Sequence, residues 1–248
     1  MPRIAYPLYA LCAYAIGMAS ILYLVGFLAG AGVPKTLDAG PAAALPPGAW
    51  TNLVVLVAFL LVHSVMARPA FKARWTRLVP EPLERATYIL VSGLTTFALV
   101  WAWQPMPGLV WDVGDGAART ALYAGQALGW AMIVLATFNI DHFAFFGLRQ
   151  AWDRYQRRRH RPAPFTARFL YGLVRHPISL GWLVIFWSAP RMSEGHLLFA
   201  GVMSLYIALV TPIEERDLLA ALGDDYARYR RRVRAFLPWP RASREENA

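Results

Sequence analysis

The stretch LVRHPISLGWLVIFWSAP, residues 173–190, places a cation and an imidazole at the edge of an apolar run. Arg175 and His176 stand directly before Pro177, and the fourteen residues from Pro177 to Pro190 carry no charge. As a helix this run is about 21 Å long, which is too short to cross a bilayer alone. Either the helix begins earlier, near Phe169, and carries the pair into the membrane, or it turns back at partial depth and pairs with the next helix. Both alternatives bury the pair in protein, because such groups are costly against lipid.

Five longer stretches without acidic or basic residues accompany this run. The chain is 57% hydrophobic and 16% charged, with a mean hydropathy of +0.37, which is typical of membrane proteins rather than soluble domains. Each stretch is near or above the ~20 residues that cross a bilayer as helix. We therefore predict an all-α, polytopic membrane bundle of five to six transmembrane helices. The expected spans are residues 4–34, 50–67, 86–107, 120–140 and 196–213.

The N-terminal span is expected to be retained. It follows Arg3, as in a secretory signal, but it is longer than the apolar core of such a signal, and no clear small-residue cleavage site follows. The single cysteine, Cys12, lies inside this span. The sequence therefore holds no disulfide framework.

Basic residues are concentrated in alternate connections between the spans. If both termini face the cytoplasm, the inner segments hold Arg3, five basic residues in 68–85, seven in 149–168 and eight from 216 onward, and the outer loops hold only Lys35, Arg119 and Arg191. This asymmetry predicts a multi-pass protein with both termini cytoplasmic. It also argues against nucleic-acid binding despite a pI near 10.2, because basic loops beside anionic membrane lipid have this composition.

Polar residues gather at four helix ends of the expected cytoplasmic half. The four ends are His63 with Ser64, FNIDHFAFFGLRQ at 138–150, VRHP at 174–177, and EERD at 214–217. Helix ends that bring these side chains to one level are typical of the walls of a single pocket. The alternative interpretation is that each is an interfacial cap or a snorkelling side chain.

The segment after EERD predicts a C-terminal cytoplasmic amphipathic helix. Its apolar residues recur every third or fourth position opposite a basic face, and they are Leu218, Leu222, Tyr226, Tyr229, Val233 and Phe236. Gly223 is expected to end a first short helix. The amphipathic segment either lies along the membrane surface or folds over the pocket as a lid.

The order RHP, Gly181, a short helical hairpin, EERDL, Gly223 and a Tyr pair resembles the S-adenosylmethionine-using membrane methyltransferases related to isoprenylcysteine carboxyl methyltransferase. HSVMARPAFK, ERATYIL and FNIDHFAFFGLRQ are similar to the methanethiol S-methyltransferase branch of that superfamily. The resemblance covers most of residues 50–236. It implies S-adenosyl-L-methionine-dependent methylation of a small thiol, methanethiol to dimethyl sulfide, by direct displacement at the cytoplasmic side of a bacterial inner membrane.

One membrane methyltransferase domain, residues 1–248, is therefore expected. It comprises an N-terminal helix and outer loop (1–49), a catalytic core (50–236) and a frayed tail (237–248). No obligate protein partner and no metal site are inferred.

Two departures from the family pattern bear on the substrate. Ser179 stands where the motif Arg-His-Pro-x-Tyr-x-Gly has its tyrosine, so a cofactor contact made by that ring is lost or supplied by Tyr171. Val210 stands where the prenylcysteine enzymes have an arginine implicated in binding the substrate carboxylate. A pocket without that guanidinium is poorly suited to a carboxylate substrate and favours a small neutral or thiolate nucleophile.

S-adenosylmethionine carries a carboxylate, an amino group, a sulfonium, ribose hydroxyls and adenine, so its site needs cations, acceptors and an apolar slot. Arg175 and His176 are candidates to hold the carboxylate, helped by the N-terminus of the helix that begins at Pro177. Glu214 or Glu215 is the candidate acceptor for the amino group or the ribose hydroxyls.

Aromatic side chains are the candidates for the adenine slot. Tyr171, Tyr226 and Tyr229 are expected to wall it, and Gly181 to let the backbone approach the cofactor closely.

The acceptor thiol must lose its proton, because the thiolate is the nucleophile. Asp141 and His142 are the candidates to take or relay that proton, with Arg149 or His63 as electrostatic support. The rival interpretation of Asp141 and His142 is a helix-end cap.

Three other functions stay open. A haem or electron-transfer protein would need His63 and His142 to face each other across helices. A non-catalytic accessory protein of nitrogen-oxide metabolism would not bind S-adenosylmethionine. A methyltransferase could also act on another thiol or on a lipid.

Overall fold

The computed structural model describes residues 2–42, 46, 48–161, 165 and 167–238. Within these residues, five helices are long and apolar enough to cross a membrane. They are α1 (Ala5–Ala29), α2 (Ala49–Ala67), α4 (Glu81–Ala102), α5 (Ala117–Ile140) and α10 (Glu194–Leu222). The prediction of an all-α polytopic bundle is thus confirmed. Most of the expected frayed tail lies outside the described residues.

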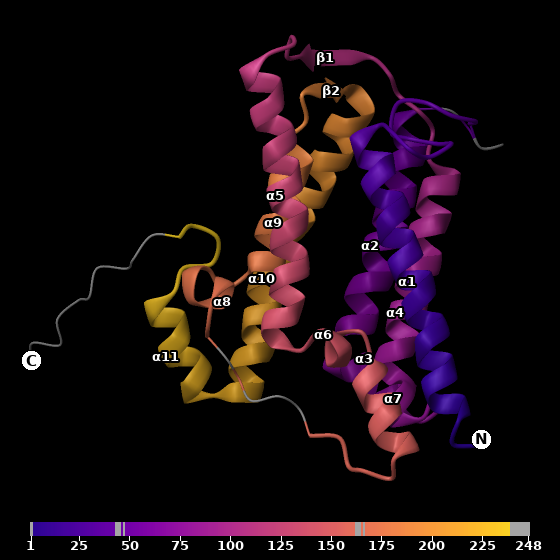
Figure 1. Ribbon diagram of the computed structural model, residues 1–248, viewed down its shortest axis with the longest axis vertical. Coiled ribbons are helices and arrows are strands. Elements are labelled where there is room, and N and C mark those ends of the chain that lie inside the picture. The colour runs from indigo at the N-terminus through magenta and orange to yellow at the C-terminus, as the bar shows by residue number, and fades with distance from the viewer. Residues whose placement is uncertain (1, 43–45, 47, 162–164, 166, 239–248) are drawn as a thin grey trace, which may run out of the picture.

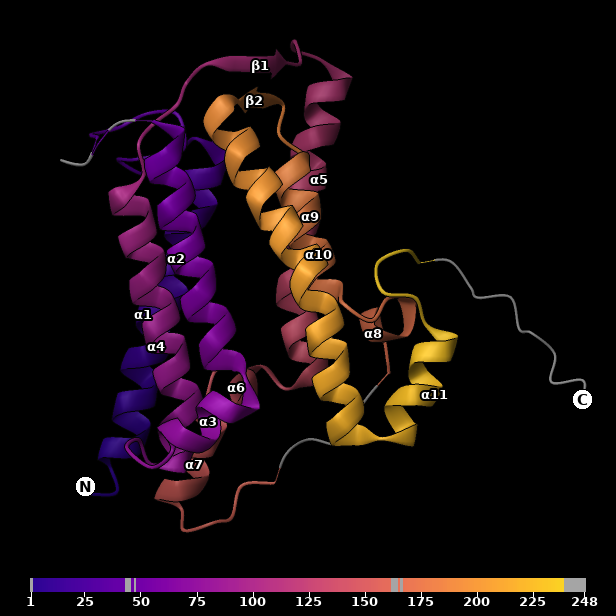
Figure 2. The same cartoon turned by 180° about the vertical axis from the view of Figure 1, so that it is seen from behind.

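Shorter elements connect the long helices. The short helices are α3 (Pro69–Trp75), α6 (His142–Phe145), α7 (Leu148–Tyr155), α8 (Leu170–Leu173), α9 (Pro177–Trp187) and α11 (Asp224–Arg232). Two strands that the sequence did not predict, β1 (Leu109–Asp112) and β2 (Arg191–Ser193), pair antiparallel with Leu109 opposite Ser193 and Asp112 opposite Arg191. Figures 1 and 2 show this pair at one end of the bundle, opposite the end where α1 begins.

Helix α9 is the short apolar run with which the sequence analysis began. It does not begin near Phe169, because Val174 is extended and Pro177 disfavours helical backbone at His176. The chain enters α9 partway along the bundle and turns back at β2, where it joins α10 (Figure 1). Arg175 and His176 are 9% and 8% exposed, so protein covers them, as both alternatives expected.

Local signals in the sequence end several helices. Gly30 ends α1 in the left-handed region with φ of 71°. Arg68 is extended before Pro69 and separates α2 from α3. Gly223, with φ of 56°, ends α10, as expected.

Two helix pairs approach closely through facing glycines. A Cβ added at Gly93 on α4 would lie 3.2 Å from the Cα of Gly17 on α1. A Cβ added at Gly181 on α9 would lie 2.8 Å from the carbonyl oxygen of Gly129 on α5. Small residues of this kind let helix backbones pack tightly in membranes. Gly181 was expected to let the backbone approach the cofactor closely, and the side of Gly181 on which a side chain would stand instead faces the backbone of α5.

An aromatic cluster near the β1–β2 end joins α1, the end of α4 and α10. The ring of Trp103 lies 6.0 Å from Phe27 and 5.9 Å from Phe199, both edge to face. The indole of Trp103 donates to the carbonyl oxygen of Leu37 at 3.1 Å. Edge-to-face pairs of this kind add about 0.5–1.5 kcal/mol each beyond area burial. Trp103 is fully buried in this cluster.

The glycine contact between α5 and α9 predicts that a larger residue at position 129 destabilises the protein. In Gly129→Ala the new Cβ would lie 2.7 Å from a side-chain carbon of Ile185 and 2.8 Å from the carbonyl oxygen of Gly181. We expect a loss of about 1–3 kcal/mol of stability, as for other overpacked sites. The measurement is the melting temperature in detergent micelles.

The matched control is Gly201→Ala in α10, where an added Cβ meets nothing within 4 Å. Alanine favours helix over glycine by about 1 kcal/mol, so this variant should be as stable as the wild type or slightly more stable. Equal melting temperatures for the two variants would contradict the close approach.

Candidate active site

A buried ion pair lies where the loop before α9 meets α10. Arg175 Nε and Nη2 donate to the same oxygen, Oε1 of Glu215, at 2.8 and 2.5 Å. His176 Nε2 lies 3.1 Å from that oxygen. Arg175 Nη1 also donates to the carbonyl oxygens of Arg230 and Val233. We call Arg175, His176 and Glu215 the Arg–His–Glu corner.

The segment after α11, residues 233–237, runs beside this corner as a non-helical strap. The backbone amides of Arg175 and His176 donate to the carbonyl oxygens of Arg234 and Ala235 at 2.8 and 3.1 Å. The expected helical stripe therefore stops short of Phe236, because α11 ends at Arg232 and Val233 is extended. The β-branched Val233 and the proline at 238 were the available signals for this end.

The three predicted tyrosines come together against α11. The hydroxyl of Tyr229 donates to the carbonyl oxygen of Tyr171 at 2.6 Å, and the rings of Tyr226 and Tyr229 lie 5.8 Å apart. Phe165, which sequence reasoning missed, packs edge to face on Tyr229 at 5.1 Å. Burial raises the pKa of all three phenols, so each is neutral at physiological pH. The rings of Phe165, Tyr226 and Tyr229 make an aromatic wall beside the corner.

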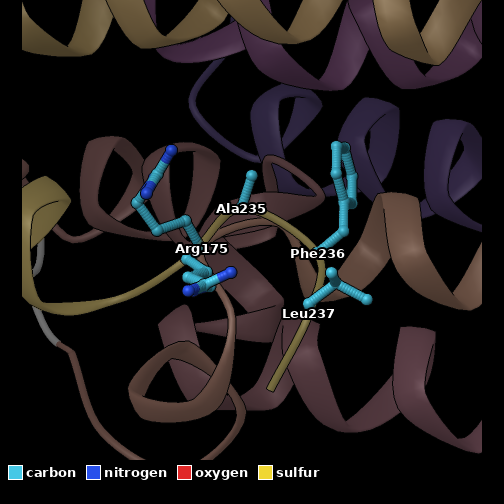
Figure 3. Close-up of a pocket in the computed structure, with 5 residues that line it drawn as sticks. Arg175, Ala235, Phe236 and Leu237 are labelled. Atoms are coloured by element: carbon cyan, nitrogen blue, oxygen red, sulfur yellow. The ribbon is translucent and has the colours of Figure 1, made fainter. Parts of the chain in front are cut away.

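A cavity of about 440 Å³ opens between the corner and the strap. Figure 3 shows its lining, which consists of Arg175, Arg234, Ala235, Phe236 and Leu237. The ring of Phe236 lies 5.8 Å from the imidazole of His176. The volume is in the range of small-molecule sites, about 300–1,000 Å³.

Glu214 and Glu215 have different surroundings although they are adjacent. The side chain of Glu215 is 11% exposed and engaged by Arg175 and His176. The side chain of Glu214 is 42% exposed, and its Oε2 lies 3.9 Å from His176 Nδ1. The imidazole of His176 therefore lies between two carboxylates, of which Glu214 is the less engaged.

The predicted proton acceptor Asp141 is a helix cap in this structure. Its Oδ1 accepts from the backbone amide of Ala144 at 3.0 Å, at the start of α6. Its Oδ2 lies 2.8 Å from Nε of Arg149. The rival interpretation, a helix-end cap, thus describes the contacts of Asp141.

Both ring nitrogens of His142 are engaged. Nε2 lies 3.0 Å from the hydroxyl of Tyr14 on α1, and Nδ1 lies 2.8 Å from the hydroxyl of Thr137 on α5. The imidazole stacks on Phe138 with ring centres 4.3 Å apart. Burial lowers the pKa of His142, and the charge of Asp141 partly opposes this shift. These contacts hold a neutral imidazole between α1 and α5.

His63 belongs to another set of contacts. Its Nδ1 lies 2.9 Å from the carbonyl oxygen of Phe59, one turn earlier in α2, and its ring packs against Phe59 and against Tyr88 of α4. Since a carbonyl oxygen only accepts, Nδ1 carries the proton. The facing pair of His63 and His142 that the haem hypothesis requires is not formed, because His142 is held by α1 and α5.

The structure therefore divides the predicted single pocket. Arg175, His176, Glu214, Glu215 and the tyrosines gather around α8, the start of α9 and α11. Asp141, His142 and Arg149 lie around α6 and α7, which Figures 1 and 2 place on the other side of α10 from α8 and α11. The chain turns sharply at Asp141, where φ is 158°, and the contact with Tyr14 holds the next residue toward α1.

Several known proteins similar to this chain are named for one reaction. The chain is 45% identical to the methanethiol S-methyltransferase of Mycobacterium tuberculosis over 240 residues, 97% of this chain and 98% of that protein. It is 41% identical to methanethiol S-methyltransferase 1 of Bradyrhizobium diazoefficiens, over 95% of this chain and 82% of that protein. It is 40% identical to the methanethiol S-methyltransferase of Pseudomonas deceptionensis, over 95% of this chain and 90% of that protein. No family model matches the sequence, and no solved structure matches it.

A helical membrane bundle with a buried polar corner, together with these relatives, defines a membrane-bound methyltransferase. The chain belongs to the methanethiol S-methyltransferase family.

The buried pair of Arg175 and Glu215 predicts a large loss of stability when Glu215 is replaced by a neutral residue. Glu215→Gln would leave the guanidinium of Arg175 buried without a counter-charge, and breaking a buried pair costs about 3–5 kcal/mol. The control is Asp217→Asn, whose partner Arg68 lies at 2.9 Å with side chains 25% and 37% exposed. An exposed pair contributes about 0–1 kcal/mol. We expect a much lower melting temperature for Glu215→Gln only, and similar decreases would contradict a buried pair.

Protonation of His142 should destabilise the fold. Its pKa in the folded protein is below the ordinary 6.5, so the unfolded chain binds this proton more readily. The stabilisation from the neutral ring is therefore complete above a pH of about 6.5 and is lost as the pH falls below it. We expect the melting temperature to fall between pH 7.5 and 5.5, and the fall to be smaller in His142→Gln. An unchanged slope in His142→Gln would rule out this contribution.

Proposed function

We propose that this protein transfers the methyl group of S-adenosyl-L-methionine to a small thiol, with methanethiol as acceptor and dimethyl sulfide as product. The observation that carries the proposal is the name methanethiol S-methyltransferase, shared by relatives that align over nearly the whole chain. The reaction is placed at the cytoplasmic side of the bacterial inner membrane, with both termini in the cytoplasm and residues 50–236 as the catalytic core. The charge asymmetry of the loops supports this orientation.

The residues around the cavity fit the chemistry of this methyl donor. The donor carries a carboxylate, an amino group and hydroxyls beside an aromatic base, and the cavity offers two guanidinium side chains and an apolar strap next to an aromatic wall. When bound, S-adenosylmethionine supplies an activated methyl group on a sulfonium. Tyr171, Tyr226 and Tyr229 are assigned to the adenine, and Phe165 adds a further face.

Glu214 is the better candidate for the amino group or the ribose hydroxyls. Nε and Nη2 of Arg175 and Nε2 of His176 all contact one oxygen of Glu215, so Glu215 holds the corner together. Glu214 keeps a half-exposed carboxylate within 3.9 Å of His176. His176 and the N-terminus of α9 at Pro177 are assigned to orient the cofactor beside it.

The protein's contribution to methyl transfer is orientation and exclusion of water. A thiolate that meets a sulfonium neutralises two charges, so a water-poor pocket favours the displacement. The proton of the acceptor thiol must leave first, since free thiols are mostly protonated at neutral pH. Asp141 and His142, with Arg149 and His63 as support, stay the predicted acceptors. This role requires His142 to release Thr137 or Tyr14, because both ring nitrogens are engaged.

Headspace gas chromatography over membranes that contain this protein tests the proposal directly. With S-adenosylmethionine and methanethiol supplied, we expect dimethyl sulfide from the wild type. His176→Ala should produce at least about tenfold less, because an orienting contact that strengthens in the transition state contributes ~1.4 kcal/mol or more. The control His160→Gln changes a histidine outside the corner and should leave the yield unchanged.

Absence of product from the wild type while labelled S-adenosylmethionine still binds would show that the acceptor is a different one. Absence of binding would contradict the proposed cofactor and favour a non-catalytic role.

A further inference from the structure

Arg175 has little capacity left for a ligand. Its Nε and Nη2 donate to Glu215, and its Nη1 donates to the carbonyl oxygens of Arg230 and Val233. A guanidinium has five N–H groups, so four donor contacts leave about one. Its charge is also balanced by the carboxylate of Glu215 at contact distance. An anionic group in the adjacent cavity therefore needs a second cation.

Arg234 is the cation that remains in the cavity lining. Its Nε is buried and has no hydrogen-bond partner in the part of the chain that the structure describes. A buried donor without an acceptor costs about 1–3 kcal/mol, which a ligand oxygen would offset.

The backbone of Arg234 is fixed at the cavity wall. Its carbonyl oxygen accepts from the amide of Arg175 at 2.8 Å, and Val174 and Arg234 form a parallel bridge. The Cα of Arg234 is therefore fixed on the strap, and its side chain lines the cavity together with Ala235, Phe236 and Leu237. A guanidinium placed in this way suits a planar, bidentate acceptor.

We propose that Arg234 binds the carboxylate of the methionine moiety of S-adenosylmethionine, and that the strap forms one wall of the cofactor site. This inference rests on the proposed function, because it assigns a part of that cofactor to this cavity. Arg175 then acts as a positioning residue, since it holds the strap through Val233 and through the backbone of Arg234. Apolar contacts from Phe236 and Leu237 fit the carbon chain that leads to the carboxylate.

A comparison of two ligands tests this assignment. Dissociation constants are measured in detergent for S-adenosylmethionine and for its decarboxylated analogue, which keeps the sulfonium, amine and adenosine but has no carboxylate. We expect Arg234→Gln to weaken binding of S-adenosylmethionine by about 10- to 100-fold, the effect of one charged hydrogen-bonded contact. Binding of the decarboxylated analogue should change little.

The matched control is Arg232→Gln, which removes the same charge from an exposed position at the end of α11. It should leave both dissociation constants unchanged. Arg234→Lys keeps the charge without the planar fork and should restore part of the preference for the carboxylated ligand. The melting temperature of Arg234→Gln shows whether that variant folds. If it does not fold, the dissociation constants of Arg234→Lys for the two ligands still test the assignment.

Equal weakening of both ligands by Arg234→Gln, or no weakening, would overturn the assignment. An equal loss of affinity for S-adenosylmethionine in Arg232→Gln would also overturn the assignment, because the effect of Arg234 would then come from long-range charge and not from a direct contact. Failure of the wild type to bind S-adenosylmethionine at all would instead overturn the proposed function.

Discussion

The corner depends on the buried pair of Arg175 and Glu215. Moving two charges away from water costs several kcal/mol each, and their attraction offsets this only when further hydrogen bonds satisfy both groups. Here the carbonyl oxygens of Arg230 and Val233 accept from Nη1 of the guanidinium, and His176 contacts the same carboxylate oxygen. The pair therefore links the start of α9, the end of α10 and the strap. Separation of the start of α9 from α10 would leave a buried charge unpaired, and movement of the strap would leave a buried donor of Arg175 without its acceptor.

The opposite end of the bundle supplies the rigidity that this corner needs. Phe27, Trp103 and Phe199 pack from α1, the end of α4 and α10, and the β1–β2 pair closes the chain over them. The facing glycines at 129 and 181 fix α9 against α5. Because His176 is the N-cap residue of α9, the packing of this helix also sets the position of the imidazole. A site held on packed helices keeps its geometry better than one on loops.

Much of this architecture could be predicted from the sequence, because hydropathy, charge asymmetry and local breakers act within short windows. The spans, the start of α9 at Pro177 and the end of α10 at Gly223 are of this kind. The gathering of VRHP with EERD was predicted from the polar residues at the helix ends of one half of the bundle. The contacts of His142 could not be predicted, since its partner Tyr14 is 128 residues away and nothing local indicates it. Gly181 was predicted to face a ligand, and only the structure shows that it faces another helix.

The adjacent glutamates illustrate how a helix assigns two roles to one residue type. Successive residues in an α-helix point about 100° apart, so Glu214 and Glu215 cannot share an environment. Glu215 faces the guanidinium of Arg175 and is buried, whereas Glu214 remains half-exposed beside the other nitrogen of His176. A carboxylate that holds a buried cation cannot leave it for a ligand without a large cost. The structural role therefore belongs to Glu215, and Glu214 is the carboxylate of the two that we propose binds an incoming amino group or hydroxyl.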